Sequence, residues 1–337
     1  MRVMQSFGVP RATTNPYIHM LDDALAGTRG IEHLRWSRRR ALLGRYDALH
    51  VHWPELLFGG STAPRKLARR AFAIALRIRL TLTPVAVVRT MHNLAPHSDV
   101  SEWERRYLAW LDRRTDHVIV LNEHTPRDAG TAATLIAHGH YRDWFDSVPR
   151  ADPAPAALGF VGLVRRYKGV EDLLDAFIAT AKAAPALTLR IAGSPSDRDI
   201  EQDVRARASA DARVVLDLRY LAEHEFAHVV TQCSGVVLPY RSMHNSGSVL
   251  AVLSLDRPVL VPRNEVTEAL AAEVGPGWIT TFDGPVSKIA LLEFAATIEQ
   301  LPSRAPDLSA RAWDDVGQRH RAVFAEAMAH RREGAAS

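Results

Sequence analysis

A cluster of basic residues follows a short apolar run at residues 159–177, with the sequence GFVGLVRRYKGVEDLLDAF. This pattern predicts a strand, a turn with Gly162, Arg165 and Lys168, and an amphipathic helix that begins near Gly169. Unpaired backbone N–H groups and the helix dipole favour anions at such a helix start. The spacing therefore indicates a phosphate site, and a solvated basic turn is the alternative.

A second polar loop stands between a predicted strand and a predicted helix within residues 236–262. It contains Asn245, Ser246, Gly247 and Ser248. Small hydroxyl residues and a glycine at a helix start let the backbone approach a ligand phosphate closely. The same residues also suit an ordinary helix cap, with Asn245 or Ser246 at the N-cap position.

These loops belong to a regular alternation of short β-branched runs and longer segments of helical period, which predicts an α/β fold. In the first half, strands are expected near 1–6, 31–36, 47–52, 85–91, 117–121 and 134–137, and helices near 16–27, 63–80, 101–114 and 124–132. Strands joined by helical crossovers are parallel, so their carboxyl ends share the edge where open α/β sheets bind ligands.

The proline-rich stretch 147–157 predicts a linker between domains 1–146 and 158–305. In the second half, strands are expected at 158–163, 187–192, 213–216, 235–239, 258–261 and 277–281. Residues 306–332 predict a C-terminal helix, which we expect to pack back on the first domain, and the remaining tail is expected to be disordered.

Composition narrows the possible classes of function. A length of 337 residues, 47% of them hydrophobic and 24% charged, is typical of a folded protein of about two domains. The single cysteine, Cys233, excludes an internal disulfide and a Cys-rich metal site. No apolar run suits a spanning helix or a signal peptide, so a cytoplasmic location is expected. The glycine-rich dinucleotide and Walker A motifs are absent, which disfavours dehydrogenases and P-loop enzymes.

Charge is unevenly divided along the chain. Residues 1–150 hold 22 Lys and Arg against 14 Asp and Glu, although the net charge of the whole chain is only +4. The first half could therefore bind an anion such as a lipid headgroup, a nucleic acid or a phosphate-bearing substrate, and arginine as the habitual surface residue is the alternative. No nucleic acid is expected among the partners. The predicted helix 63–80 is basic and amphipathic, so it could lie on anionic lipid. A core-facing helix with a solvated outer face is the alternative.

The order of these features resembles the donor domain of glycosyltransferases with the GT-B fold, above all those of family 4. The similarity rests on 159–177, on the strand LRIAG at 189–193, and on a strand ending in LPY before a polar loop and RPVLVP. It covers residues 150–300 well and the first half only in layout. The resemblance implies two Rossmann-like domains facing a cleft. It also implies transfer of a hexose from a GDP- or UDP-sugar, with a lean to GDP-mannose, to a saccharide or lipid-linked saccharide in cell-surface glycan assembly.

Residues of the second half take their expected roles from this resemblance. In that family an arginine and a lysine after the first strand of the donor domain hold the donor diphosphate, and here these are Arg165 and Lys168. The family's two glutamates, spaced E-x7-E, fall on Met243 and Ala251, so both carboxylates are missing. The polar loop before the predicted helix could bind the diphosphate instead, and either a retaining or an inverting reaction stays open.

The first half would then bind the acceptor and share in catalysis. By resemblance His92, after predicted strand 85–91, is expected near the donor sugar and phosphate, where it can donate a hydrogen bond; a bond within its own loop is the alternative. Glu55 or Asp99 would act as general base in an inverting enzyme. Other residues expected to line the acceptor site or the cleft are Gly8, Asn15, Tyr17, His52, Asn93, His138 and His140.

No metal and no cofactor beyond the nucleotide-sugar co-substrate is expected, because Arg165, Lys168 and a helix start can neutralise the diphosphate. A metal held by His138 and His140 would need a third ligand. Two other functions stay open: a GT-B sugar-nucleotide epimerase and a non-catalytic two-lobed binding protein. Helix 63–80 also leaves open a peripheral contact with the inner face of the membrane.

Overall fold

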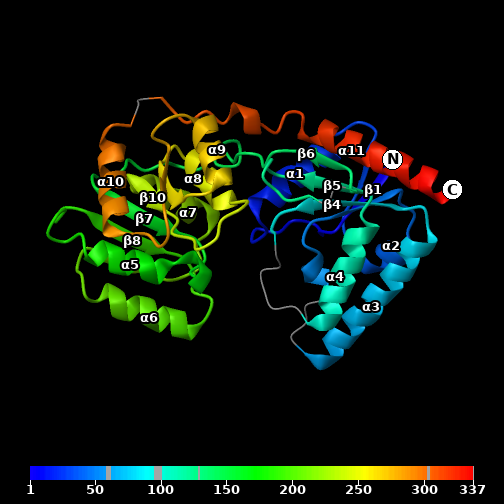
Figure 1. The fold of residues 1–337 in the computed structure, drawn as a ribbon, viewed down its shortest axis with the longest axis horizontal. Coiled ribbons are helices and arrows are strands. Elements are labelled where there is room, and N and C mark those ends of the chain that lie inside the picture. Colours follow the sequence, from blue (N-terminus) through cyan, green and yellow to red (C-terminus); the bar gives the residue numbers. More distant parts are fainter. Residues whose placement is uncertain (58–61, 95–100, 128–129, 302–303, 337) are drawn as a thin grey trace. The chain divides into compact units, whose positions relative to one another are not determined.

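The protein is described here by a computed structural model that covers residues 1–57, 62–94, 101–127, 130–301 and 304–336, with the backbone alone for 334–336. The chain divides into two compact units (Figure 1). Unit 1 comprises Met1–Gly139 and Ala312–Ser337, and unit 2 comprises His140–Arg311. Each unit contains one six-stranded parallel sheet flanked by helices. The expected α/β fold is therefore confirmed.

The strands of unit 1 are β1 (Arg2–Gln5), β2 (Glu32–Leu34), β3 (Ala48–Val51), β4 (Ala86–Met91), β5 (His117–Val120) and β6 (Ala133–Leu135). They lie in the order β2-β1-β3-β4-β5-β6. The direction in which strands are added reverses between β1 and β3. Ligands of open α/β sheets bind outside the carboxyl ends of the strands at such a reversal.

Helices cover both faces of this sheet. They are α1 (Pro16–Ala26), α2 (Arg38–Leu43), α3 (Ala63–Leu82), α4 (Glu102–Arg114) and α11 (Val316–Ala336), with a 3-10 turn η1 (Pro54–Leu57). Successive side chains of a strand point to opposite faces. Leu49 and Val51 of β3 therefore pack with the core of α2, α3 and α4, whereas His50 between them packs against Phe324 of α11. Figure 1 shows α11 lying along the sheet.

The strands of unit 2 are β7 (Ala157–Val161), β8 (Thr188–Ala192), β9 (Val214–Asp217), β10 (Gly235–Val237), β11 (Val259–Pro262) and β12 (Ile279–Phe282), in the order β12-β11-β10-β7-β8-β9. Its helices are α5 (Val170–Ile178), α6 (Arg198–Ala208), α7 (Glu223–Gln232), α8 (Gly247–Ser254), α9 (Glu265–Val274) and α10 (Lys288–Glu299), with 3-10 turns η2 (Arg166–Lys168) and η3 (Ser309–Arg311). This is the doubly wound Rossmann order, and it reverses between β7 and β10.

Three expectations about helices were wrong. The described residues of 124–132 form turns rather than a helix, in keeping with Pro126 and Gly130 in that stretch. The C-terminal helix begins at Val316, not at Pro306, and it continues through the expected disordered tail to Ala336. Helix α2 was not foreseen, because six residues carry too little periodicity to be recognised.

The proline-rich stretch 147–157 packs as part of unit 2. The backbone N–H of Ala151 donates a hydrogen bond of 2.9 Å to Oγ1 of Thr231 in α7. Packing divides the chain between Gly139 and His140, before the predicted linker. After η3 the chain returns to unit 1, where α11 packs beside α1.

Candidate active site

A sharp turn after β7 in unit 2 brings Lys168 back to the ends of the strands. Gly169 follows with a φ of +65°, and a Cβ atom there would lie 2.2 Å from the carbonyl oxygen of Pro239. Only glycine fits both conditions. The Nζ atom of Lys168 lies close to Gly162, since a Cβ atom built on Gly162 would be 3.5 Å from it. Gly162 directly follows β7, next to the reversal between β7 and β10.

Lys168 is buried, and no carboxylate of the described residues forms an ion pair with it. Its exposed fraction is 8%, and its Nζ lies 4.9 Å from the centroid of the Tyr240 ring. Within the described parts of the chain, the ammonium forms no ion pair. Burying an unpaired charge is costly, and a cation–π contact offsets only part of that cost. The site is therefore suited to an anionic ligand that pairs with Lys168.

The amino end of α8 is linked to this lysine through Tyr240. The Tyr240 hydroxyl donates a hydrogen bond of 3.3 Å to Oγ of Ser248 in the first turn of α8. Ser246 is the N-cap, because its Oγ accepts a hydrogen bond from the backbone N–H of Val249. The cap does not exclude an anion at this helix start, since one cap leaves other N–H groups of the first turn available.

The other expected diphosphate residues lie around the same turn. Arg165 directly precedes η2, is half-buried and forms no ion pair among the described residues. Its neighbour Arg166 pairs instead with Glu171 of α5. Asn245 lies in the loop before the N-cap of α8. The two positions that lack the family's glutamates, Met243 and Ala251, are both buried.

Unit 1 collects polar side chains on the sheet face that α11 covers. Gln5 ends β1, His50 and His52 alternate at the end of β3, and Thr90 and His92 alternate at the end of β4. The period of two in each strand places these side chains on one face. Parallel pairing of β1 with β3 and of β3 with β4 brings them into contact.

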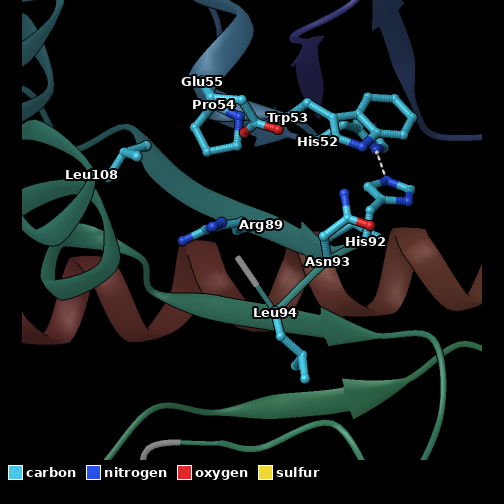
Figure 2. A pocket seen from close by; sticks show the side chains of 10 residues that line it. His52, Trp53, Pro54, Glu55, Arg89, His92, Asn93, Leu94 and Leu108 are labelled. Carbon is cyan, nitrogen blue, oxygen red and sulfur yellow. Dashed lines mark hydrogen bonds between the residues drawn. The ribbon is translucent and has the colours of Figure 1, made fainter. Parts of the chain in front are cut away.

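A hydrogen-bonded chain runs through these residues. Nδ1 of His52 lies 3.0 Å from Nε2 of His92, and Nε2 of His52 lies 3.3 Å from Oε1 of Gln5. The Trp53 ring stacks on the His92 ring at 4.0 Å with an interplanar angle of 19°. Figure 2 shows the His52–His92 bond beside this stack. The imidazole of His92 is thereby held on one edge and one face.

Burial keeps the neighbouring imidazoles neutral. Desolvation lowers the pKa of His52 to about 3 and that of His320 in α11 to about 4. The pKa of His50 is also held well below its ordinary value by desolvation, assisted by repulsion from other histidines of the cluster. At neutral pH these rings therefore act as hydrogen-bonding groups rather than as cations.

Tyr17 also contacts the His92 ring. Its ring meets the His92 ring edge-on at 5.2 Å, the His138 ring at 4.7 Å and the Trp313 ring at 5.6 Å. Burial raises the pKa of the Tyr17 hydroxyl well above its ordinary value. Asn15 serves as the N-cap of α1 by accepting a hydrogen bond of 3.0 Å from the backbone N–H of Tyr17.

A pocket opens beside His92 at the carboxyl edge of β3 and β4 (Figure 2). It is lined by His52, Trp53, Pro54, Glu55, Arg89, Thr90, His92, Asn93, Leu94 and Leu108. Arg89 pairs with Asp112 of α4; desolvation lowers the pKa of its guanidinium, which the charge of Glu55 partly offsets. The pocket thus joins an aromatic wall, an imidazole and side chains of both charges.

The structure groups some predicted residues and separates others. His52, Asn93 and Glu55 line the pocket with His92. The Tyr17 ring contacts the His92 ring, and the His138 ring contacts Tyr17. Gly8 is exposed beyond β1, where a Cβ atom would have open space for 4 Å around it. His140 belongs to unit 2, whereas His138 belongs to unit 1. Asp99 lies outside the described residues, as does His97.

Sequence reasoning missed several residues that complete the two sites: Gln5, Trp53, Arg89, Tyr240 and Trp313. Gln5 and Tyr240 stand at or just after the ends of strands, so position alone could have marked them. Trp313 could not be found in this way, because it precedes α11 and reaches Tyr17 only through the fold.

No three His, Cys, Asp or Glu side chains gather as a metal site in the part of the chain that the structure describes. The sequence does contain one Asp-x-Asp triplet, residues 197–199. Asp197, however, is the N-cap of α6, where its Oδ1 accepts a hydrogen bond of 3.0 Å from the backbone N–H of Ile200.

The amino-acid sequence of this chain is similar to those of known proteins. Residues 155–301 match the family model described as glycosyl transferases group 1. Over 327 residues, 97% of this chain and 92% of the relative, the chain is 42% identical to a Xanthomonas campestris protein named GDP-mannose:glycolipid 4-beta-D-mannosyltransferase.

Solved structures share the fold at low sequence identity. Anabaena HepE in complex with UDP has a TM-score of 0.61 and 13% identity, covering 99% of this chain and 98% of its own. An Escherichia coli structure described as trehalose-6-phosphate bound with UDP-2-fluoro glucose also has a TM-score of 0.61, with 10% identity and coverage of 99% and 97%. The expected GT-B fold is confirmed.

Proposed function

The chain belongs to the group 1 glycosyl transferases, and from that premise we propose that it moves mannose from GDP-mannose to a hydroxyl group of a glycolipid acceptor. The named activity of the relative that is 42% identical supports this donor and this acceptor class. The same relative favours a transferase over an epimerase or a non-catalytic binding protein.

The observation that carries the proposal is the buried Lys168 at the strand reversal of unit 2, which forms no ion pair with any residue that the structure describes. A nucleoside diphosphate would supply the missing negative charge. The first turn of α8, linked to Lys168 by Tyr240 and Ser248, would add N–H donors to the same anion. Arg165 is the second cation proposed for this diphosphate.

Unit 1 is proposed to bind the acceptor in the pocket beside His92. Trp53 offers an apolar ring face of the kind that packs against sugar rings, and Glu55, Arg89 and Asn93 offer polar groups to its hydroxyls. In this proposal His92 takes part in the reaction, while His52 and Tyr17 fix the position of its ring.

Helix α3 supports a peripheral contact of the enzyme with the membrane that holds its acceptor. Its buried face is formed by Ala73, Leu76 and Leu80. A second apolar stripe remains exposed, because Leu67, Ile74, Ile78 and Leu82 recur at helical spacing with exposed fractions of 71, 47, 54 and 78%.

Cations border this exposed stripe. Lys66 is exposed, and the guanidinium groups of Arg70 and Arg77 lie over the rings of Trp103 and Trp110 in α4, 5.4 and 5.2 Å from the ring centroids. Apolar residues flanked by cations suit an anionic lipid surface. Among the described residues no helix is both long and apolar enough to cross a bilayer. We therefore propose a cytoplasmic enzyme that touches the inner face of the membrane through α3.

Direct assay tests the proposed function. The protein should transfer mannose from GDP-mannose to a membrane extract of lipid-linked saccharides, with the product detected by mass spectrometry. Free GDP should also raise the melting temperature, since a ligand at 100 times its dissociation constant stabilises a protein by about 2.7 kcal/mol. No transfer and no thermal shift with GDP, UDP or dTDP would contradict the proposal.

A further inference from the structure

Another pocket of unit 1 lies at the amino edge of its sheet, whereas the pocket beside His92 lies at the carboxyl edge. Its volume is about 390 Å³, which is within the usual range for a ligand site. It is lined where three parallel strands begin, by Arg2 of β1, Asp47 before β3 and Val85 before β4. The ends of α2, α3 and α11 complete it, and Figure 1 shows the ends of α3 and α11 on the same side of unit 1. We call it the amino-edge pocket.

Positive charge prevails in the amino-edge pocket. The charged side chains among its described lining residues are four arginines and one carboxylate: Arg2, Arg45, Arg79, Arg332 and Asp47. Arg2 is paired with Glu32 of β2, 3.0 Å away. The other three arginines form no ion pair with any residue that the structure describes. Asp47 offsets one charge, and its Oδ2 already accepts a hydrogen bond of 2.7 Å from the backbone N–H of Arg2. An excess of positive charge therefore remains, which favours an anionic ligand.

Arg79 fixes one wall of this pocket. Its guanidinium donates hydrogen bonds to the backbone carbonyl oxygens of Leu42 and Gly44, and so joins the end of α3 to the end of α2. It also lies over the Tyr46 ring, 4.7 Å from the centroid. All these partners are neutral, so they leave the charge of Arg79 uncompensated. Arg45 and Arg332 are exposed, and their longer reach suits them to contact a ligand directly.

An apolar wall stands behind these cations. Tyr46 and Val85 are each only 5% exposed, and Met328 of α11 is half-buried beside them. An inorganic anion would leave this wall without a partner. A phosphate ester of an organic group, in contrast, would place its phosphate among the arginines and its carbon atoms against the apolar wall.

Two exposed leucines flank the amino-edge pocket. Leu43 and Leu82 are each 78% exposed, and each directly precedes a lining residue, Gly44 and Thr83 respectively. Leu82 is also the last member of the exposed apolar stripe of α3. The pocket therefore adjoins the end of the surface that is proposed to touch the membrane. Apolar side chains beside a cationic pocket suit the boundary between lipid tails and anionic headgroups.

We propose that the amino-edge pocket binds the headgroup phosphate of an anionic membrane phospholipid. Arg45 and Arg332 hold the phosphate through charge-assisted hydrogen bonds, and Arg79 adds positive charge from the wall. The glycerol part of the lipid lies against Tyr46 and Met328. The proposal rests on the membrane contact proposed for α3 and is independent of the sugar that is transferred.

Methionine-methyl NMR of the full-length protein tests the pocket without a membrane. Dihexanoyl phosphatidylglycerol, dissolved as a monomer, should shift the signal of Met328, which Met328→Leu assigns. Dihexanoyl phosphatidylcholine, which has no net charge, should leave that signal in place, and sodium phosphate should shift it much less because it does not reach the apolar wall. No shift with phosphatidylglycerol would overturn the proposal. An equal shift with phosphatidylcholine or with sodium phosphate would do the same.

Flotation with vesicles of phosphatidylcholine and phosphatidylglycerol in equal parts tests the pocket at a membrane. Arg45→Gln combined with Arg332→Gln removes the two exposed cations, so the bound fraction should fall about tenfold or more. Arg79 stays in place, which preserves the connection between α2 and α3. A bound fraction that does not change in this double variant would overturn the proposal.

Arg29→Gln combined with Arg113→Gln is the matched control. Both arginines are exposed, form no ion pair among the described residues and lie at the same edge of unit 1, before β2 and in the last turn of α4. Neither lines the pocket. An equal loss in the two double variants would indicate diffuse attraction and overturn the proposal. If no vesicles bind while Met328 still responds to phosphatidylglycerol, the pocket is supported and the membrane contact of α3 is wrong.

Discussion

Nδ1 of His52 lies 3.0 Å from Nε2 of His92, although the two residues are 40 positions apart in the chain. Each follows a strand directly, and the strands β3 and β4 are paired in parallel. Because Val51 pairs with Arg89, the two histidines are offset by two residues along the paired strands, and the period of two places both side chains on one face at the carboxyl edge of the sheet. Here that edge is also the wall of the pocket proposed for the acceptor.

Removal of His92 should lower turnover far more than donor affinity. If its imidazole donates a hydrogen bond to the sugar or to the departing phosphate as charge develops there, His92→Ala should reduce kcat roughly 100-fold or more. Steady-state kinetics and calorimetry with GDP measure the two effects separately. His97→Ala serves as the control; loss of turnover there, with His92→Ala near normal, would require the catalytic histidine to be reassigned.

Lys168 should matter for the diphosphate more than for the fold. A charge-assisted hydrogen bond contributes roughly 1.5–3 kcal/mol, so Lys168→Ala should weaken GDP binding about tenfold or more. Arg165→Ala should act in the same direction. Lys182→Ala, an exposed lysine of the same unit, is the matched control. Unchanged affinity in both site variants, measured by calorimetry, would rule out this diphosphate site.

Transfer should not require a divalent metal. Lys168, Arg165 and the amino end of α8 are proposed to neutralise the departing diphosphate in place of a cation. Turnover should therefore persist in EDTA at the rate seen with Mg²⁺ or Mn²⁺. Activity that disappears on chelation and returns with either metal would contradict this prediction.

Acid should destabilise the protein through its buried histidines. Desolvation lowers the pKa of His320 to about 4 in the folded state, below the ordinary value of 6.5. The unfolded chain therefore binds the proton first, and the stability contribution, complete above pH 6.5, falls as the pH drops toward 4. By pH 5 the loss from this residue is about 2 kcal/mol.

The variant His320→Leu isolates this effect, because leucine fills the buried position against Phe324 and cannot titrate. Urea unfolding at pH 7.5 and pH 5 should show a smaller difference for His320→Leu than for the natural sequence. An equal difference in the two proteins would mean that folding does not shift the pKa of His320, which would contradict this prediction.

Helix α3 should determine binding to anionic vesicles. Replacing Ile74 and Ile78 by aspartate removes apolar surface and adds charge of the wrong sign, so the bound fraction in flotation should fall at least tenfold. Val215→Asp, at a half-exposed valine of β9, is the control for a single exposed apolar residue. Vesicle binding that survives the α3 substitutions would exclude this helix as the contact.

The sequence by itself determined the α/β class, the approximate strands and the donor-domain motif. These features depend on local periodicity and on short spacings such as that of Gly162, Lys168 and Gly169, which one segment of chain contains in full. The absence of the family's two glutamates was also visible in the sequence. Counting back from a recognisable strand places their positions at Met243 and Ala251.

Tertiary structure alone decided which of the many strand-end residues act together. The sheet order of unit 1 places β1 between β2 and β3, so Gln5 lies beside His50 and its side chain bonds to His52. Likewise, α11 returns from the end of the chain to cover this face, which buries the imidazoles and lowers their pKa values. Strand order and the docking of a distant helix arise from long-range packing, which local periodicity does not encode.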